Sequence, residues 1–307
     1  MVYETDIETP VIACYKPRQG ETQLIQQESV HFEPLLVATE FEDNHENILY
    51  RLVLKQGRNV LRHDALVMVP SVREDTLWED GIAAPHLLPS QILRYTLPSR
   101  YCDSDKLSDF AWQKFGHISH GLERVHAMCD WIHNNIEYRT GSGSPHISAS
   151  DVIHRGYGVC RDFAHSLVAL CRTFNMPARY VSGYVPDIGY LDPGTPMDFH
   201  AYCEVYLAGR WQIFDARFNK PRTGRIRISA GYDAVNCAFA TIYGSARLTS
   251  FSVWSYQVDP AQVSITDPVD LSKRLCGSPE IRRPGETVDA ASFAETDTPS
   301  LVFQSCD

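Results

Sequence analysis

The sequence predicts an α+β fold, in which an antiparallel β-sandwich-like domain precedes a helix packed on a second antiparallel sheet. Three observations predict it. In the first third of the chain, apolar residues alternate along short segments, as in half-buried strands. From residue 122 the apolar spacing becomes that of helices, and after residue 178 it returns to alternation. Turn-forming residues separate these segments, so the change of period marks a change of domain.

Length and composition narrow the classes of protein. The chain has 307 residues, enough for two domains. Its 28 Lys and Arg against 38 Asp and Glu give a net charge of −10, which argues against nucleic acid or an anionic membrane as the main partner. No apolar run approaches the roughly 18 residues of a membrane span, and the first residues lack the features of a secretory signal. Nine cysteines without C-x-x-C spacing argue against a disulfide framework or a zinc site. We therefore expect a cytoplasmic protein without a metal or other cofactor.

The first predicted domain covers residues 1–97. Its clearest strand runs from Ile48 to Lys55, where side chains of alternating polarity lie between two polar turns. A second strand, Ala65–Val69, ends at Pro70. No cluster of ionisable residues demands a catalytic role here, so a structural or docking role is expected.

The second predicted domain covers residues 98–267, and a disordered tail is expected for 268–307. Apolar residues at helical spacing predict a helix from Leu122 to Ile136, and Ser148–Asp151 resembles the start of a short helix that ends near Gly156. The helix of main interest starts at Cys160, because its apolar positions continue at helical spacing to Phe174.

Two strands follow the Cys160 helix. Along His200–Leu207 one face carries Ala201, Cys203 and their alternate neighbours, and the other carries His200, Tyr202 and Glu204. A short turn leads to the strand Trp211–Ala216, so His200 and Asp215 can face each other across a hairpin. We expect both on the side that faces Cys160, with Cys203 buried on the reverse, and we expect Tyr202 and Glu204 to contact the substrate.

These residues form a nucleophile, a base and an orienting carboxylate. A thiol in the first turn of a helix faces unpaired N–H groups and the positive end of the helix dipole, which favour the thiolate. His200 can take the thiol proton, and Asp215 can hold the imidazole and stabilise its charged form. The backbone N–H of Cys160 could help to bind an oxyanion.

Four blocks of sequence carry a family resemblance. They fall within residues 121–218: Gly158–Ala164, Pro177–Tyr184, His200–Tyr206 and Trp211–Asp215. As a set they resemble the bacterial transglutaminase-like family, of the papain-like fold group. The resemblance implies a papain-like/transglutaminase-like core, an N-terminal β domain, and Cys160, His200 and Asp215 as the catalytic triad. The chain departs from the family's usual Asp-Pro-Thr, because it has Asp215-Ala216-Arg217. A second oxyanion donor is left open, with Asn135 and Tyr138 upstream as sources.

The sequence thus predicts a thiol enzyme that acts on amide or peptide bonds of a protein or peptide substrate. It leaves open whether water resolves the thioester, as in a protease or amidase, or an amine does, as in protein-glutamine acyl transfer. The alternative is a non-catalytic binding or scaffold module that retains the fold. The reactivity of the thiol would separate the two.

Overall fold

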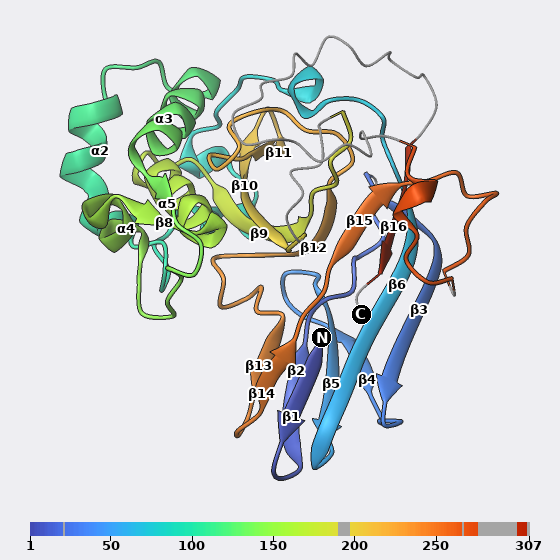
Figure 1. Ribbon diagram of the computed structural model, residues 1–307. Helices are drawn as coiled ribbons and strands as arrows, with labels where there is room; N and C mark the ends of the chain where they lie inside the picture. Colours follow the sequence, from blue (N-terminus) through green and yellow to red (C-terminus); the bar gives the residue numbers. More distant parts are fainter. Residues whose placement is uncertain (21, 190–196, 266, 276–299, 306–307) are drawn as a thin grey trace.

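The computed structural model describes residues 1–20, 22–189, 197–265, 267–275 and 300–305. Two β-sheets pack face to face in the lower part of Figure 1, and a helix-bearing core with its own antiparallel sheet lies above them. The predicted α+β class, with a β-sandwich before a helix on an antiparallel sheet, is confirmed.

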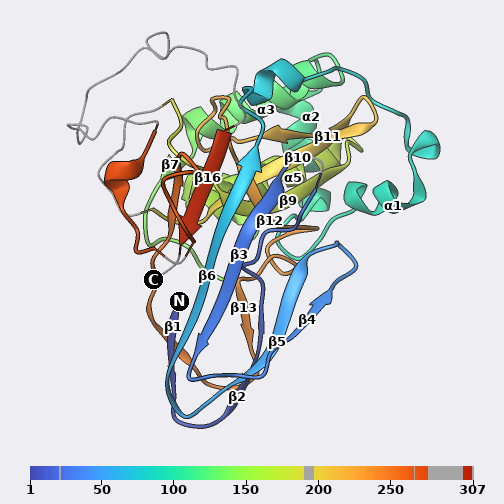
Figure 2. The same ribbon diagram turned by 90° about the vertical axis from the view of Figure 1, so that its right-hand side faces the viewer.

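The β-sandwich consists of a six-stranded and a four-stranded sheet. Its N-terminal strands are β1 (Val2–Thr5), β2 (Thr9–Ala13), β3 (Leu24–Glu33), β4 (Thr39–Glu42), β5 (Ile48–Leu54) and β6 (Gly57–Val69). Both views show β2, β4 and β5 in one layer and β1, β3 and β6 in the other (Figures 1 and 2). The alternation predicted for residues 48–55 is confirmed, because Tyr50, Leu52 and Leu54 are buried between the layers whereas Arg51 is exposed.

Strands from much later in the chain complete the sandwich. They are β13 (Ala240–Ile242), β14 (Arg247–Ser250), β15 (Trp254–Gln257) and β16 (Ser300–Ser305). β13 pairs with β2, β14 with β1, and β16 with both β6 and β15. The boundaries 1–97 and 98–267 stay predictions, but the pairing adds strands from beyond residue 239 to the N-terminal sheets. Apolar alternation does not show which sheet a strand joins, so the sequence could not predict this.

The predicted disordered tail, 268–307, lies largely outside the described residues. Within it, the structure describes a 3-10 turn, Leu271–Lys273, and strand β16.

The helices lie between β6 and the third sheet in sequence. They are the 3-10 turns η1 (Glu74–Leu77), η2 (Pro85–Leu87), η3 (Arg94–Thr96) and η4 (Ser104–Leu107), and the helices α1 (Ser90–Leu93), α2 (Ser108–Phe115), α3 (Leu122–Asn135), α4 (Ala149–Arg155) and α5 (Cys160–Thr173). The predicted starts of α3 and α5 are confirmed. Two short parallel strands, β7 (Glu137–Tyr138) and β8 (Tyr157–Gly158), flank α4. Among the described residues, no helix is long and apolar enough to cross a membrane.

The third sheet has the strand order β11-β10-β9-β12, from β9 (Ala178–Tyr184), β10 (His200–Leu207), β11 (Arg210–Phe214) and β12 (Ile226–Gly231). Helix α5 packs on one face of this sheet. Leu167 and Val168 of the helix share a core with Cys203 and Val205 of β10, and all four are fully buried. The predicted burial of Cys203 is therefore confirmed, and the apolar face of β10 fixes where the helix lies.

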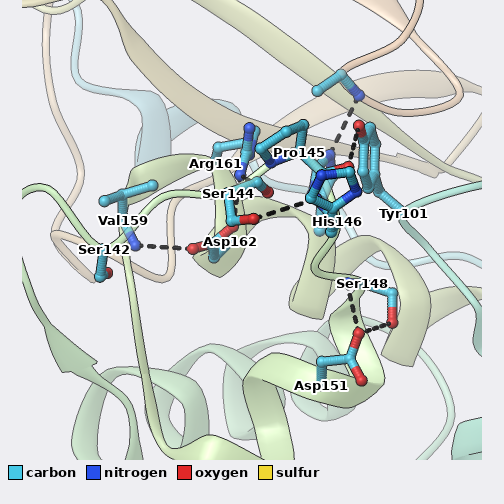
Figure 3. Close-up of polar contacts among 12 residues, drawn as sticks. Tyr101, Ser142, Ser144, Pro145, His146, Ser148, Asp151, Val159, Arg161 and Asp162 are labelled. Atoms are coloured by element: carbon cyan, nitrogen blue, oxygen red, sulfur yellow. Dashed lines mark hydrogen bonds and ion pairs between the residues drawn. The ribbon is translucent and has the colours of Figure 1, made fainter.

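The turn before α5 is held by a buried carboxylate. Asp162 accepts a hydrogen bond from the N–H of Val159 at 3.1 Å (Figure 3). It also forms an ion pair with Arg155 at 2.9 Å, and it is fully buried. Gly158 makes this possible, because a Cβ there would lie 2.7 Å from Cβ of Asp162. Gly156 ends α4 with φ of 73°, a left-handed conformation that glycine adopts without strain. The two glycines and Asp162 therefore set the position of Cys160.

We expect Asp162→Ala to destabilise the protein by about 3 kcal/mol, because it leaves the Arg155 guanidinium and the Val159 N–H without their partner. The matched control is Asp151→Ala, which removes the equivalent carboxylate at the start of α4. Asp151 is exposed and bonds to Ser148, so its loss should cost about 1 kcal/mol. Urea unfolding of the two variants checks the difference, and equal losses would contradict the role given to Asp162.

Candidate active site

Cys160 is the first residue of α5. Its side chain packs beside Ala164, Tyr180 and Ala201, and it is partly exposed. The other six cysteines of the described residues are buried. Burial raises the pKa of Cys14 and of Cys102 to about 12, and that of Cys129, Cys203 and Cys237 well above the ordinary value. In the described part of the chain, Cys160 therefore combines access to solvent with a helix N-terminus.

His200 and Asp215 are brought together by the β10–β11 hairpin. His200 starts β10, Asp215 follows the last residue of β11, and the two strands pair antiparallel. The His200 Nε2 lies 2.8 Å from Oδ2 of Asp215, in an interaction that is almost completely buried. Oδ1 of the same carboxylate accepts the N–H groups of Arg217 at 3.0 Å and Phe218 at 3.3 Å. The carboxylate is thus fixed on both oxygens.

The proton affinity of His200 is set by this pair and by Cys160. Burial by itself lowers the pKa of His200, but the charge of Asp215 and the hydrogen bonds with Asp215 and Cys160 outweigh it and raise the pKa to about 9. Burial likewise raises the pKa of Asp215, and the charges of His200 and Arg225 outweigh it, so that this pKa lies far below its ordinary value. The arrangement favours an imidazolium beside the thiol and an ionised Asp215.

Two further charged residues, Arg225 and Glu74, complete the buried network. Arg225 precedes β12, and its guanidinium lies 2.8 Å from Oδ2 of Asp215. It also donates to Glu74 of η1. Burial raises the pKa of Glu74 above its ordinary value, although Arg225 acts in the opposite direction. No sequence pattern pointed to these two residues, because they are 151 positions apart and belong to no motif.

We expected His200 and Asp215 on the side that faces Cys160, with Cys203 on the reverse. His200 does meet Cys160, but the placement of Cys203 on the side away from the helix is wrong. Helix α5 covers the face that carries Ala201 and Cys203. His200 nevertheless hydrogen-bonds to Cys160, because each is the first residue of its element and both elements begin at the same end of the sheet. Alternation determines to which face a side chain within a strand points. His200 is the first residue of its strand, so its side chain can reach beyond the end of the sheet.

Tyr202 and Glu204 lie on the His200 face, as the alternation predicts, but both are buried. Tyr202 packs with Val181 and Ala230, and the Arg225 guanidinium lies 4.7 Å from its ring centroid. Glu204 accepts a hydrogen bond from Arg179 at 2.6 Å. Neither side chain offers an exposed surface to a substrate in this structure, so their predicted substrate contact stays a prediction without geometric support.

Of the two upstream candidates, Tyr138 interacts electrostatically with Cys160, and Asn135 is engaged elsewhere. Burial raises the pKa of Tyr138, and the negative charge of Cys160 adds to the effect. Asn135 donates from its side chain to the carbonyl of Trp131, within α3. On the other side of the site, the ring of Phe218 lies 4.8 Å from that of His200. In the described ranges, no group of three His, Cys, Asp or Glu residues could hold a metal ion.

Comparisons with known proteins place this arrangement in context. The model of the transglutaminase-like superfamily matches residues 109–216. A solved structure from Cytophaga hutchinsonii, provisionally described as a cysteine protease, is 34% identical, covers 81% of this chain and 85% of that chain, and gives a TM-score of 0.68. An uncharacterised protein of Mycobacterium leprae is 33% identical over 132 residues, which are 42% of this chain and 47% of the relative. Human kyphoscoliosis peptidase is 30% identical over 104 residues, which are 31% of this chain and 15% of the peptidase. The chain therefore spans about half of the mycobacterial relative and a small part of the human one.

The raised pKa of His200 predicts how stability depends on pH. The unfolded histidine titrates near 6.5, so the stability that the charged imidazole contributes is fully present below pH 6.5 and is lost as the pH rises through about 9. The shift corresponds to about 3 kcal/mol. We expect the free energy of unfolding, measured in urea at pH 6, 7.5 and 9, to fall more steeply for the wild type than for His200→Gln. Parallel curves for the two proteins would contradict the shift.

Proposed function

Because the chain belongs to the transglutaminase-like superfamily, we propose that it is a thiol enzyme that acts on amide or peptide bonds through Cys160, His200 and Asp215. The proposed substrate is a protein or a peptide. The proposed setting is the cytoplasm, because the seven cysteines of the described residues are free thiols, which suits reducing conditions.

One observation carries the proposal: His200 is hydrogen-bonded to Cys160 and to Asp215 at the N-terminus of a buried helix. In such a unit the nucleophile is activated by a base, and the base is oriented by a third group. Because Nε2 of His200 faces Asp215, Nδ1 is left for the thiol. The ionised Asp215 carboxylate lies next to the imidazole, and its ion pair with Arg225 compensates the buried negative charge.

The first half of the reaction forms a thioester. The reactive form is a thiolate–imidazolium pair, in which His200 already carries the Cys160 proton, and the thiolate sulfur attacks the carbonyl carbon of the amide. The N–H of Cys160 lies in the first turn, where N–H groups lack intrahelical partners, so it can donate to the developing oxyanion. Tyr138 is the proposed second donor, because its raised pKa keeps the hydroxyl protonated. The tetrahedral intermediate then collapses, the C–N bond breaks, and the leaving amine takes the proton from His200.

The second half of the reaction resolves the thioester. Water or a primary amine gives a proton to His200 and attacks the thioester carbonyl, and the C–S bond breaks as the thiol is regenerated. Water yields a carboxylic acid, and an amine yields a new amide. The same residues serve both outcomes, so the chain is proposed as a protease or amidase or as an acyltransferase.

We expect Cys160 to react first with iodoacetamide at pH 6, in a background where Cys276 and Cys306 are replaced by Ser. An unassisted thiol with a pKa of about 8.5 is less than about 1% thiolate at this pH. His200→Gln should therefore slow alkylation of Cys160 at pH 6 by about 100-fold, with a smaller difference at pH 9. Mass spectrometry of the digested protein identifies the modified cysteine. Earlier modification of another cysteine, or equal rates in the two proteins, would favour the scaffold alternative.

We expect Cys160→Ala to abolish turnover of peptide amides, and Asp215→Asn to lower kcat by about 10⁴-fold, the size of the loss when a serine protease loses the carboxylate that orients its histidine. Release of peptide fragments is measured with and without a primary amine such as monodansylcadaverine. Incorporation of the amine identifies acyl transfer, and fragments without incorporation identify hydrolysis. Turnover that survives Cys160→Ala would rule out the proposed nucleophile.

A further inference from the structure

The turn after Asp215 fixes the backbone of Arg217. The Arg217 N–H donates to Oδ1 of Asp215 at 3.0 Å. Its carbonyl accepts a hydrogen bond from Nδ1 of His133, on α3, at 3.1 Å. Arg217 stands where the sequence departs from the pattern that it otherwise resembles, so its side chain is a feature of this chain that the proposed reaction does not yet use.

The guanidinium of Arg217 packs on two aromatic rings, one of which contacts His200. Its central carbon is 3.8 Å from the ring centroid of Tyr138 and 5.5 Å from that of Phe218. Phe218 contacts His200, with 4.8 Å between ring centroids. Tyr138 also hydrogen-bonds to Arg217, which lowers the pKa of Tyr138, whereas the charge of Cys160 raises it. The rings of Tyr138 and Phe218 therefore hold the guanidinium on the side of His200 where Phe218 lies.

Arg217 also has no acidic partner among the described residues, although it is only partly exposed. The other arginines around the site differ in this respect. Arg161 pairs with Asp162 at 3.4 Å, Arg225 with Asp215 at 2.8 Å, and Arg222 with Asp187 at 3.7 Å. Asp198 interacts electrostatically with His200 and Tyr138, but it forms no ion pair with Arg217 in the described structure. The Arg217 guanidinium hydrogen-bonds to the side chain of Tyr138. A guanidinium carries five N–H donors, so donors remain with which it can bind a carboxylate.

We propose that Arg217 determines substrate specificity by binding a carboxylate of the substrate next to the amide bond that Cys160 attacks. The inference rests on the proposed function, and it names acidic peptides as the substrate class. The carboxylate comes either from an Asp or Glu side chain or from the C-terminus of the substrate. Both present the same planar pair of oxygens to the guanidinium, so the experiment must separate them.

A pair of small alkylating reagents tests the charge of the site without a substrate. Iodoacetate carries a carboxylate and iodoacetamide does not, so the ratio of their rates at Cys160 reports the cation beside the sulfur. Arg217→Met keeps an unbranched aliphatic side chain and removes the charge. It should lower the iodoacetate-to-iodoacetamide ratio by about fivefold, the effect of a partly exposed charge pair. Arg217→Glu should lower it further, and Arg217→Lys should retain most of it. Added salt should narrow the differences.

The same measurement separates this inference from a merely structural role of Arg217 and from failure of the proposed function. If Arg217 only supports packing, both rates change together and their ratio stays constant in all three variants, which overturns the inference. If Cys160 reacts no faster than the buried cysteines with either reagent, the proposed function fails instead.

A peptide library gives the substrate-level test. Each random peptide is made in a Glu and a Gln version, and each version with a free and an amidated C-terminus, so that the two sources of the carboxylate are read separately. The wild type should show about fivefold higher kcat/KM for one acidic source over its neutral counterpart. Arg217→Met should remove this preference, and Arg217→Glu should reverse it toward the neutral versions of the peptides. A wild-type enzyme that cleaves acidic and neutral versions equally, with no change in the variants, overturns the inference.

Discussion

The structure of the site depends on one constraint, the burial of the Asp215 carboxylate. An ionised carboxylate inside a protein is stable only when charged partners and hydrogen-bond donors replace water. Asp215 has His200, Arg225 and two backbone N–H groups, and the guanidinium of Arg225 in turn requires Glu74. These contacts join β10, β11, the residue before β12 and η1. The charge of one carboxylate therefore determines how four segments lie around the thiol.

The third sheet divides its two faces between packing and charge. One face is apolar and packs on α5, and the other carries Tyr202, Glu204 and the buried ion pairs. The nucleophile and the base come from opposite sides of this division and meet only at the end of the sheet. There the first turn of α5 offers its free N–H groups, and the first residue of β10 reaches the sulfur. The apolar face gives the site its rigidity, and the charged face sets its proton affinities.

The sequence was informative where the determinants are local. The spacing of apolar residues located the start of α5, and alternation with a short turn brought His200 next to Asp215. The sequence was misleading where the prediction depended on how distant segments pack against one another. Alternation could not tell which face of the sheet α5 covers, nor that β14 pairs with β1. Arg225 and Glu74 left no pattern at all, since an ion pair between distant residues has no periodicity. The loop residue Arg217 was visible only as a departure from a familiar motif.

The return of β13 and β14 to strands β2 and β1 makes the helix-bearing core an insertion within the sandwich. Two lengths of chain, not one, connect the core to the sandwich, so the core cannot swing on a single hinge. Its unfolding would pull the two ends apart and strain the β1–β14 and β2–β13 ladders, which favours one cooperative transition over independent domain unfolding. During synthesis, the last strands of the sandwich are made after the residues of the site. The sandwich cannot be completed before then, so the core is the part of the molecule that can fold first.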